Sequence, residues 1–320
     1  MFGSNMKFHE LISIRTLAAI ALAAAMLIVA PGAAAWSQEQ EKEKKKQETA
    51  DPARKDDTKI PSEKEIEKNR KQVEKEKPSQ AESIVEVAIF AYGGRKQIET
   101  ARSSVQEEGT VRLTTDQGDI KGSFKLRSMR KEKSWQDLLR VDLEMEPPEA
   151  AQRSGNTTPI RYVVGFNGAT VWSAQNGQYI TPNAEAEAAF RAQLSHEYMT
   201  LLRYKEDGSK LEYVGPETVI GVPTFVIDLT TTNGDKTRYW ISSKFYRVVR
   251  CEYELKIGDA PQPVKYRVLY YYTPYKVVQN TLVPVRRVME QDGKQVQEIV
   301  INQASYSAKF DPEIFQHLQE

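Results

Sequence analysis

The sequence is poor in the side chains from which active sites and metal centres are most often built. It has one cysteine, Cys251, and three histidines, of which His9 lies near the N-terminus. One cysteine excludes an intrachain disulfide and any cysteine-rich metal site. The 45 basic and 44 acidic residues give a net charge of +1, which argues against nucleic acid as the main partner. We therefore expect no metal, no cofactor and no nucleic-acid partner.

The first 37 residues have the parts of a secretory signal peptide. Lys7 and Arg15 precede an apolar run of 14 residues (Leu17–Ala30), which a Pro-Gly pair and three alanines follow. A basic region, an apolar segment of about 7–15 residues and small residues at the cleavage site define such a peptide, whereas a membrane-spanning helix needs about 20 apolar residues. We predict cleavage near Ala35 or Ser37 and a soluble periplasmic protein, since no cysteine near that site could carry a lipid anchor.

Residues 38–80 form a highly charged segment. It holds 13 basic and 12 acidic residues among 43, no aromatic residue, and only Ile60, Ile66 and Val73 as larger aliphatic ones. Such a segment cannot bury enough apolar surface to offset the loss of chain entropy, so we expect a disordered spacer or a fraying helix. Its mixed charges favour a solvated tether over an arm that binds peptidoglycan, lipid headgroups or a membrane partner.

Residues 81–320 alternate between apolar and polar positions for most of their length. Helices are expected near residues 80–91 and 95–101 and from Ala184 to about Tyr204; elsewhere the apolar period is 2. About ten to twelve strands follow, most of them joined by tight turns such as Asn176-Gly177, so neighbours are antiparallel. The expected fold is mainly β with two or three helices (α+β), a curved antiparallel sheet that forms an open half-barrel with helices on its concave side.

The motifs of common enzyme classes are missing from the sequence. His196 lacks a second histidine at the spacing of a zinc protease, and we expect it at a helix surface or in a lid. The pair Gly93-Gly94 lacks the spacing of a phosphate-binding loop and indicates a helix end. There is no Gly-x-Ser-x-Gly elbow. The sequence therefore predicts a protein that is not an enzyme.

Several passages spread over residues 81–318 share a pattern with one known superfamily. They are a helix-to-strand passage, two strand passages and a C-terminal tail: Ala91-Tyr-Gly-Gly94 with Ser104–Val111, Glu217–Leu229, Thr237–Arg250, and Leu282-Val-Pro284 with Phe310-Asp-Pro-Glu-Ile-Phe315. These passages resemble the periplasmic lipoprotein-carrier superfamily, the LolA- and LolB-like half-barrels that include outer-membrane lipoprotein-sorting proteins. In that superfamily the concave side of the sheet holds acyl chains, so the resemblance implies non-enzymatic binding of a lipid or lipoprotein.

The predicted function is an exported carrier that binds a lipid or lipoprotein acyl chain in an apolar half-barrel cavity, in outer-membrane lipoprotein or lipid trafficking. Each apolar strand residue could line this cavity or belong to a closed core. The candidates are Val111, Leu113, Phe124, Leu126, Val141, Leu143, Phe225, Ile227, Leu229, Tyr239 and Ile241. The alternative is an envelope-stress sensor of the same fold that binds an inner- or outer-membrane protein, because the superfamily also resembles anti-sigma partner proteins.

Overall fold

The fold is built on one large antiparallel sheet. In the computed structural model of the chain, 13 strands follow the order β6-β5-β4-β3-β2-β1-β15-β14-β11-β10-β9-β8-β7, and β12 and β13 form a separate hairpin. The structure describes residues 61–75, 78–115, 118–147, 152–153, 155, 157–256, 262–270 and 275–316. The predicted signal peptide and most of the predicted spacer lie outside these residues.

The strands have the two-residue alternation that the sequence predicted. Most follow one another in the sheet. The two exceptions are the join at the centre, where β1 pairs with β15, and the pairing of β14 with β11. The strands are β1 (Ser104–Thr115), β2 (Gly118–Met129), β3 (Leu138–Met145), β4 (Ile160–Phe166), β5 (Val171–Gln175), β6 (Gln178–Ile180), β7 (Lys210–Val219), β8 (Val222–Thr230), β9 (Lys236–Ser242), β10 (Val248–Leu255), β11 (Val264–Leu269), β12 (Tyr275–Val278), β13 (Thr281–Pro284), β14 (Arg286–Gln291) and β15 (Lys294–Tyr306).

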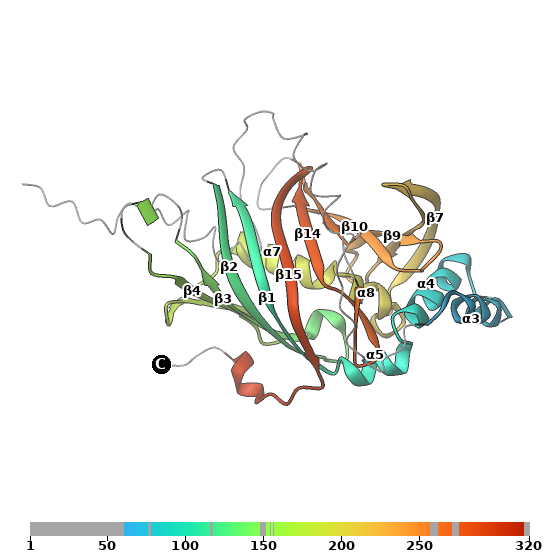
Figure 1. Cartoon of the computed structure of the whole chain (residues 1–320), viewed down its shortest axis with the longest axis horizontal. Coiled ribbons are helices and arrows are strands. Elements are labelled where there is room, and N and C mark those ends of the chain that lie inside the picture. Colours follow the sequence, from blue (N-terminus) through green and yellow to red (C-terminus); the bar gives the residue numbers. More distant parts are fainter. Residues whose placement is uncertain are drawn as a thin grey trace, which may run out of the picture.

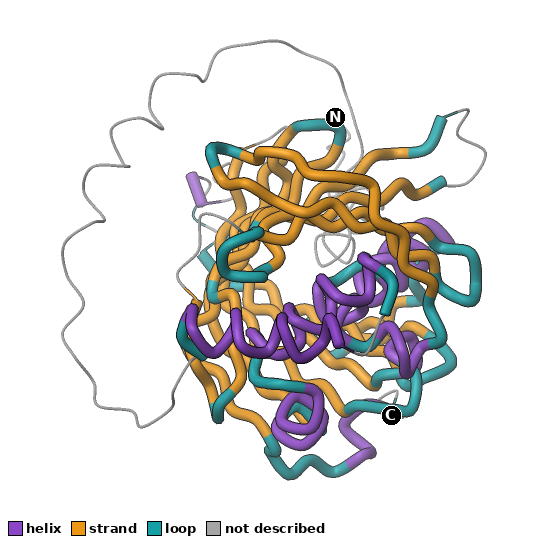
Figure 2. The backbone as a smooth tube through the Cα atoms, turned by 90° about the vertical axis from the view of Figure 1, so that its right-hand side faces the viewer, coloured by secondary structure: helices purple, strands orange, loops and turns teal. Residues whose placement is uncertain are grey.

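The helices lie on one face of the sheet, and the sheet curves around them (Figures 1 and 2). We call this face the inner face and the opposite one the outer face. The helices are α3 (Glu63–Lys75), α4 (Gln80–Ala91), α5 (Arg95–Ala101), α7 (Ala184–Ser195), α8 (Tyr198–Leu202) and α9 (Tyr204–Asp207), with short 3₁₀ turns η2 (Ser134–Gln136) and η3 (Pro312–Phe315). The predicted fold class, a curved and open antiparallel sheet with helices on its concave side, is confirmed.

Two of the expected helices form as predicted. Ser79 caps α4, because its side chain accepts a hydrogen bond from the Glu82 backbone N–H while the Glu82 carboxylate accepts one from the Ser79 N–H. The helix ends at Gly93 and Gly94, whose φ angles are positive. There, a β-carbon on Gly93 would lie 2.4 Å from the backbone oxygen of Asn280. The sequence Gly-Gly therefore allows α4 to end against the turn between β12 and β13.

The long helix expected from Ala184 to Tyr204 is wrong in detail, because the structure divides it into α7, α8 and α9. Asn183 caps α7, because its side chain accepts a hydrogen bond from the Ala186 N–H. The break lies at His196, the C-cap of α7, and at Glu197, whose extended backbone begins α8. This corner contacts the inner face, where the Tyr239 hydroxyl donates to the Glu197 carbonyl over 3.0 Å. Contacts with the sheet therefore override the helical pattern of the segment.

Part of the expected spacer is also ordered, contrary to prediction. Residues 63–75 form α3, which packs on α4, and Ile66 is only 6% exposed. Val73 packs against the same core, and the Glu63 carboxylate pairs with Lys244 over 3.1 Å. Ile66 and Val73 are seven residues apart, or two helical turns, and therefore share one face of the helix. Two apolar side chains suffice to hold this charged helix against the domain.

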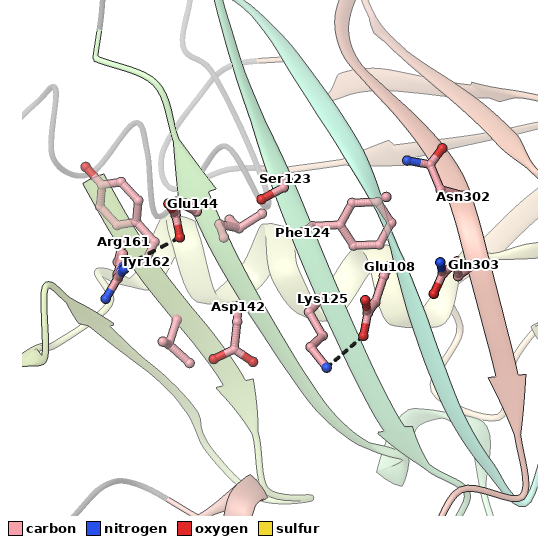
Figure 3. Close-up of a pocket in the computed structure, with 13 residues that line it drawn as sticks. Glu108, Ser123, Phe124, Lys125, Asp142, Glu144, Arg161, Tyr162, Asn302 and Gln303 are labelled. Carbon is pink, nitrogen blue, oxygen red and sulfur yellow. Dashed lines mark ion pairs between the residues drawn. The ribbon is translucent and has the colours of Figure 1, made fainter. Parts of the chain in front are cut away.

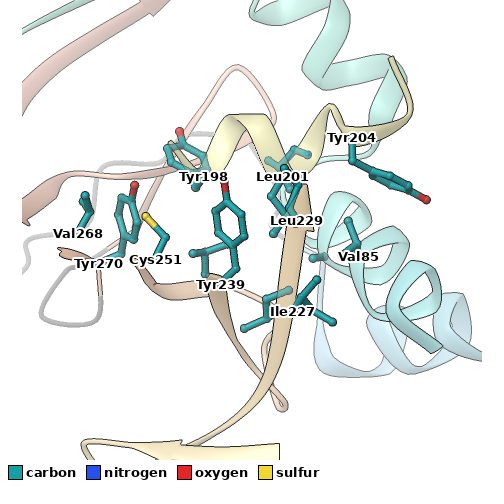
Figure 4. Packing of buried hydrophobic residues seen from close by; sticks show 14 of the residues in the cluster. Val85, Tyr198, Leu201, Tyr204, Ile227, Leu229, Tyr239, Cys251, Val268 and Tyr270 are labelled. Atoms are coloured by element: carbon teal, nitrogen blue, oxygen red, sulfur yellow. The ribbon is translucent and has the colours of Figure 1, made fainter. Parts of the chain in front are cut away.

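The main core lies between the helices and the strands β7 to β11 (Figure 4). Val85 of α4 and Leu201 of α8 pack there with the inner-face residues Ile227, Leu229 and Tyr239, all of them completely buried. Burying an aliphatic side chain of this size stabilises a protein by about 1.5–3 kcal/mol. This half of the molecule is thus closed by its own helices.

The C-terminal segment covers part of the outer face. Phe315 of η3 is fully buried, and the Trp172 indole N–H donates to its carbonyl oxygen over 2.9 Å. The Trp172 ring lies over Gly165 on the neighbouring strand, where a β-carbon would be 2.2 Å from the ring. Gly165 thus provides the space in which the Trp172 ring packs.

Candidate ligand-binding face

All eleven residues predicted to line a cavity lie on the inner face of the sheet. The ladder of β2 and β3 places Phe124 opposite Leu143 and Leu126 opposite Val141. The ladders of β1 with β2 and of β8 with β7 and β9 place the others on the same face: Val111, Leu113, Phe225, Ile227, Leu229, Tyr239 and Ile241. The structure therefore brings them to one side of the sheet, and their contact with a ligand stays a prediction.

The residues on β8 and β9 lie in the closed core. Ile227, Leu229, Tyr239 and Ile241 are all 0% exposed beneath α4 and α8, and Phe225 is half-buried. A ligand could reach the four buried residues only if the helices moved.

The residues on β1, β2 and β3 belong to a second cluster that is less completely covered. Val111, Leu113, Phe124 and Leu143 are buried. Around them lie five half-buried apolar side chains on the inner face of four strands, which we call the apolar strip: Ile299 of β15, Ile120 and Leu126 of β2, Val141 of β3 and Ile160 of β4. This strip is the part of the predicted lining that remains partly open.

A buried ion pair lies beside the apolar strip. The Arg287 guanidinium on β14 contacts the Glu107 carboxylate on β1 over 2.9 Å and the Glu197 carboxylate at the start of α8 over 2.8 Å. The side chains of Arg287 and Glu107 are 12% and 5% exposed, whereas that of Glu197 is 41% exposed. Burial by itself lowers the pKa of Arg287, but Glu197 and Glu107 raise it above its ordinary value, so the guanidinium stays charged.

A second arginine completes this network. Arg102, after α5, donates to the hydroxyls of Tyr198 and Tyr306 over 2.9 and 3.0 Å, and lies 3.8 Å from Glu107. Its guanidinium also lies over the Tyr306 ring, 4.8 Å from the centroid. Two arginines and two glutamates therefore balance in charge inside the inner face, and join the α7–α8 corner to the sheet.

His196 is buried rather than at a helix surface, contrary to prediction. It is 5% exposed, its Nδ1 lies 2.6 Å from the Thr237 hydroxyl, and its ring stacks on Tyr253 at 4.1 Å between centroids. Burial lowers the pKa of His196 to about 4, so the imidazole is neutral at physiological pH. Nearby, burial raises the pKa of the Cys251 thiol to about 12, and this thiol donates to the His196 carbonyl over 3.3 Å.

The outer face carries a polar hollow of about 460 Å³ across β15, β1, β2, β3 and β4 (Figure 3). Ion pairs border it: Lys125 contacts Glu108 over 2.7 Å, and Arg161 contacts Glu144 over 3.6 Å. Its lining combines these paired charges with parts of the apolar residues Phe124, Leu143 and Tyr162. The geometry does not favour it as a site for an acyl chain.

Sequence reasoning missed the arginine network. Glu107 and Arg287 occupy inner-face positions within otherwise apolar alternation, next to Val105 and Met289 on the same face. A charged residue at an inward position is a signal that could have indicated them, because a buried charge requires a partner. The neighbouring Glu108 faces the other side of the sheet, where it pairs with Lys125.

Comparison with known proteins reveals similarity in the fold. No family model and no curated protein matches the chain. Among solved structures, a DUF1329 family protein from Desulfovibrio piger is 12% identical with a TM-score of 0.47, over 75% of this chain and 98% of that one. A putative outer membrane lipoprotein-sorting protein domain from Vibrio parahaemolyticus is 13% identical with a TM-score of 0.45, over 78% of this chain and 94% of that one. A LolA superfamily protein from Nitrosomonas europaea is also 13% identical, with a TM-score of 0.46, over 75% of this chain and 99% of that one.

These identities and TM-scores are low, so the similarity concerns the fold alone. None of the helices among the described residues combines the length and the apolar character needed to cross a membrane. The chain is similar in fold to LolA-like proteins, as its sequence resemblance implied.

Proposed function

We propose that the protein is an exported periplasmic carrier that binds the acyl chain of a lipid or lipoprotein on the inner face of its sheet. The observation that carries this proposal is the apolar strip, whose five members stay half-buried on four strands. An acyl chain laid along the strip would gain about 0.8 kcal/mol for each methylene that it buries. The closed half of the sheet, under α4 and α8, would serve as the scaffold.

The ionisable groups near the inner face favour binding over catalysis. The high pKa of Cys251 keeps its thiol protonated, and a thiol rather than a thiolate is a poor nucleophile. His196 is held by Thr237 and stacked on Tyr253 in the closed core. These contacts give both residues structural roles, which supports a non-enzymatic carrier.

The proposal is tested by filling the strip with a larger side chain. Val141→Trp should reduce uptake of a fluorescent fatty acid by about tenfold or more, because the indole would occupy the surface on which the acyl chain lies. Overpacking costs about 1–3 kcal/mol, so circular dichroism must show that the variant is folded. Fluorescence titration gives the affinity.

Thr110→Trp is the matched control for this experiment. Thr110 is exposed and lies on the outer face of β1. In the sheet, β2 lies between β1 and β3, the strand that carries Val141. This variant should bind as the wild type does. If folded Val141→Trp also binds as the wild type does, the strip is not the site, and binding of a membrane protein partner becomes the better hypothesis.

A further inference from the structure

A small, partly open cavity lies where the apolar strip meets the arginine network. It has a volume of about 40 Å³ and lies between the α7–α8 corner and the inner face of β10, β11, β14 and β15. Glu197, Arg287 and Tyr270 contribute its polar border, and Met289 and Ile299 contribute apolar side chains. Because a buried water needs about 10–15 Å³, this volume holds about three waters or one group of three heavy atoms.

Two buried hydrogen-bond groups at this cavity lack an oxygen or nitrogen partner. The Tyr270 hydroxyl, in a side chain only 1% exposed, has only the Cys251 thiol, a weak hydrogen-bond partner, within the described part of the chain. The Nε–H of Arg287 makes none there either, although its two terminal nitrogens bind carboxylates. Buried polar groups are rarely left unpaired, and arginine is a donor only. The cavity therefore suits a group that accepts hydrogen bonds.

The two carboxylates on Arg287 differ in how easily they could leave. The Glu107 side chain is 5% exposed, so its carboxylate could not reach water without a change in the sheet. The Glu197 side chain is 41% exposed and begins a helix of five residues. A rotation of this side chain would place its carboxylate in solvent, and would leave Arg287 and Arg102 with Glu107 alone, a net positive charge that an anionic ligand could neutralise.

We propose that this cavity binds the carboxylate of a long-chain fatty acid, which replaces Glu197 on Arg287. The inference rests on the proposed carrier function and names its ligand class. Arg287 and Tyr270 would donate to the carboxylate, and the acyl chain would leave the cavity along the apolar strip. The register supports this path, since Ile299 is the direct ladder partner of Arg287, and Val111 is the next residue across the sheet.

The test compares palmitate with methyl palmitate, which has the same chain without the charge. Isothermal titration calorimetry of the full mature protein should show that palmitate binds at least tenfold more tightly than methyl palmitate. Tyr270→Phe should reduce palmitate affinity about tenfold, because a hydrogen bond to a charged group is lost, and leave the ester unchanged. Glu197→Gln should strengthen palmitate binding severalfold, because the competing anion is removed.

Tyr266→Phe is the matched control. Tyr266 lies on β11, four residues before Tyr270, is 2% exposed, and its hydroxyl makes no hydrogen bond in the described part, but it does not border the cavity. This variant should bind palmitate as the wild type does. Equal affinity for palmitate and its ester, or equal losses in the two Tyr→Phe variants, would overturn the carboxylate site and leave the carrier proposal intact. If neither palmitate nor methyl palmitate binds, the carboxylate site and the carrier proposal are both overturned.

Discussion

At the scale of single residues, His196 makes the stability of the protein depend on pH. Its folded pKa of about 4 lies below the ordinary value of about 6.5 that it has in an unfolded chain. Between these two values the unfolded state binds more protons than the folded one. The stability that the neutral imidazole contributes is therefore complete above pH 6.5 and is lost as the pH falls toward 4.

We expect His196→Gln to weaken this pH dependence. Urea unfolding at pH 7 and pH 4.5 should show that the wild type loses about 2–3 kcal/mol more than the variant over this interval. Carboxylates titrate in both proteins, so their contribution cancels in the comparison. If the two proteins lose stability in parallel, His196 is not a buried neutral histidine.

Alternation alone predicts that the candidate lining residues share one face of the sheet. Val111, Leu126, Val141 and Ile227 share one face because strand side chains alternate with a period of 2. Alternation does not show which of them a helix covers. Val141 is half-buried and Ile227 fully buried because α4 and α8 lie over only one half of the sheet, and that arrangement depends on contacts between residues distant in sequence.

At the scale of elements, α3 shows how few apolar side chains can order a charged segment. The sequence of this helix contains charged pairs such as Glu67 and Lys71, which stabilise a helix only slightly. Its attachment depends on Ile66 and Val73, which the charge density of the segment conceals. The composition of residues 38–80 predicted a disordered spacer or a fraying helix, and it does not reveal that two side chains at helical spacing pack against the domain.

Truncating one of these side chains should destabilise the whole domain. Ile66→Ala should lower the free energy of unfolding by about 2 kcal/mol, because a buried isoleucine is replaced by a smaller residue. Urea unfolding followed by circular dichroism measures the change. Lys68→Ala, at an exposed position on the same helix, should change it by less than about 0.5 kcal/mol. Equal effects in the two variants would mean that α3 does not pack on the domain.

The α7–α8 corner illustrates the limit of helical periodicity. Residues 184–204 have an apolar pattern that suits one helix, yet the chain breaks at His196 and Glu197. Thr237 and Arg287, which lie 41 and 90 residues further along the chain, bind the side chains of this corner. These partners come next to the corner only in the folded sheet, so the local sequence does not predict them.

At the scale of the whole molecule, the open sheet is the basis of the proposed function. Tight turns predict which consecutive strands pair, as Asn176-Gly177 does for β5 and β6. The sequence does not predict the pairing of β1 with β15, which joins the two ends of the domain and places Arg287, Ile299 and Val111 in one row. The strip and the cavity both depend on this long-range pairing.

The most direct test of the carrier proposal is native mass spectrometry of the mature protein purified from the periplasm. The account predicts a folded protein with an additional mass equal to that of an acyl lipid, which should be released when the protein is unfolded. Protein of the unliganded mass alone, or a complex with another protein and no lipid, would contradict it.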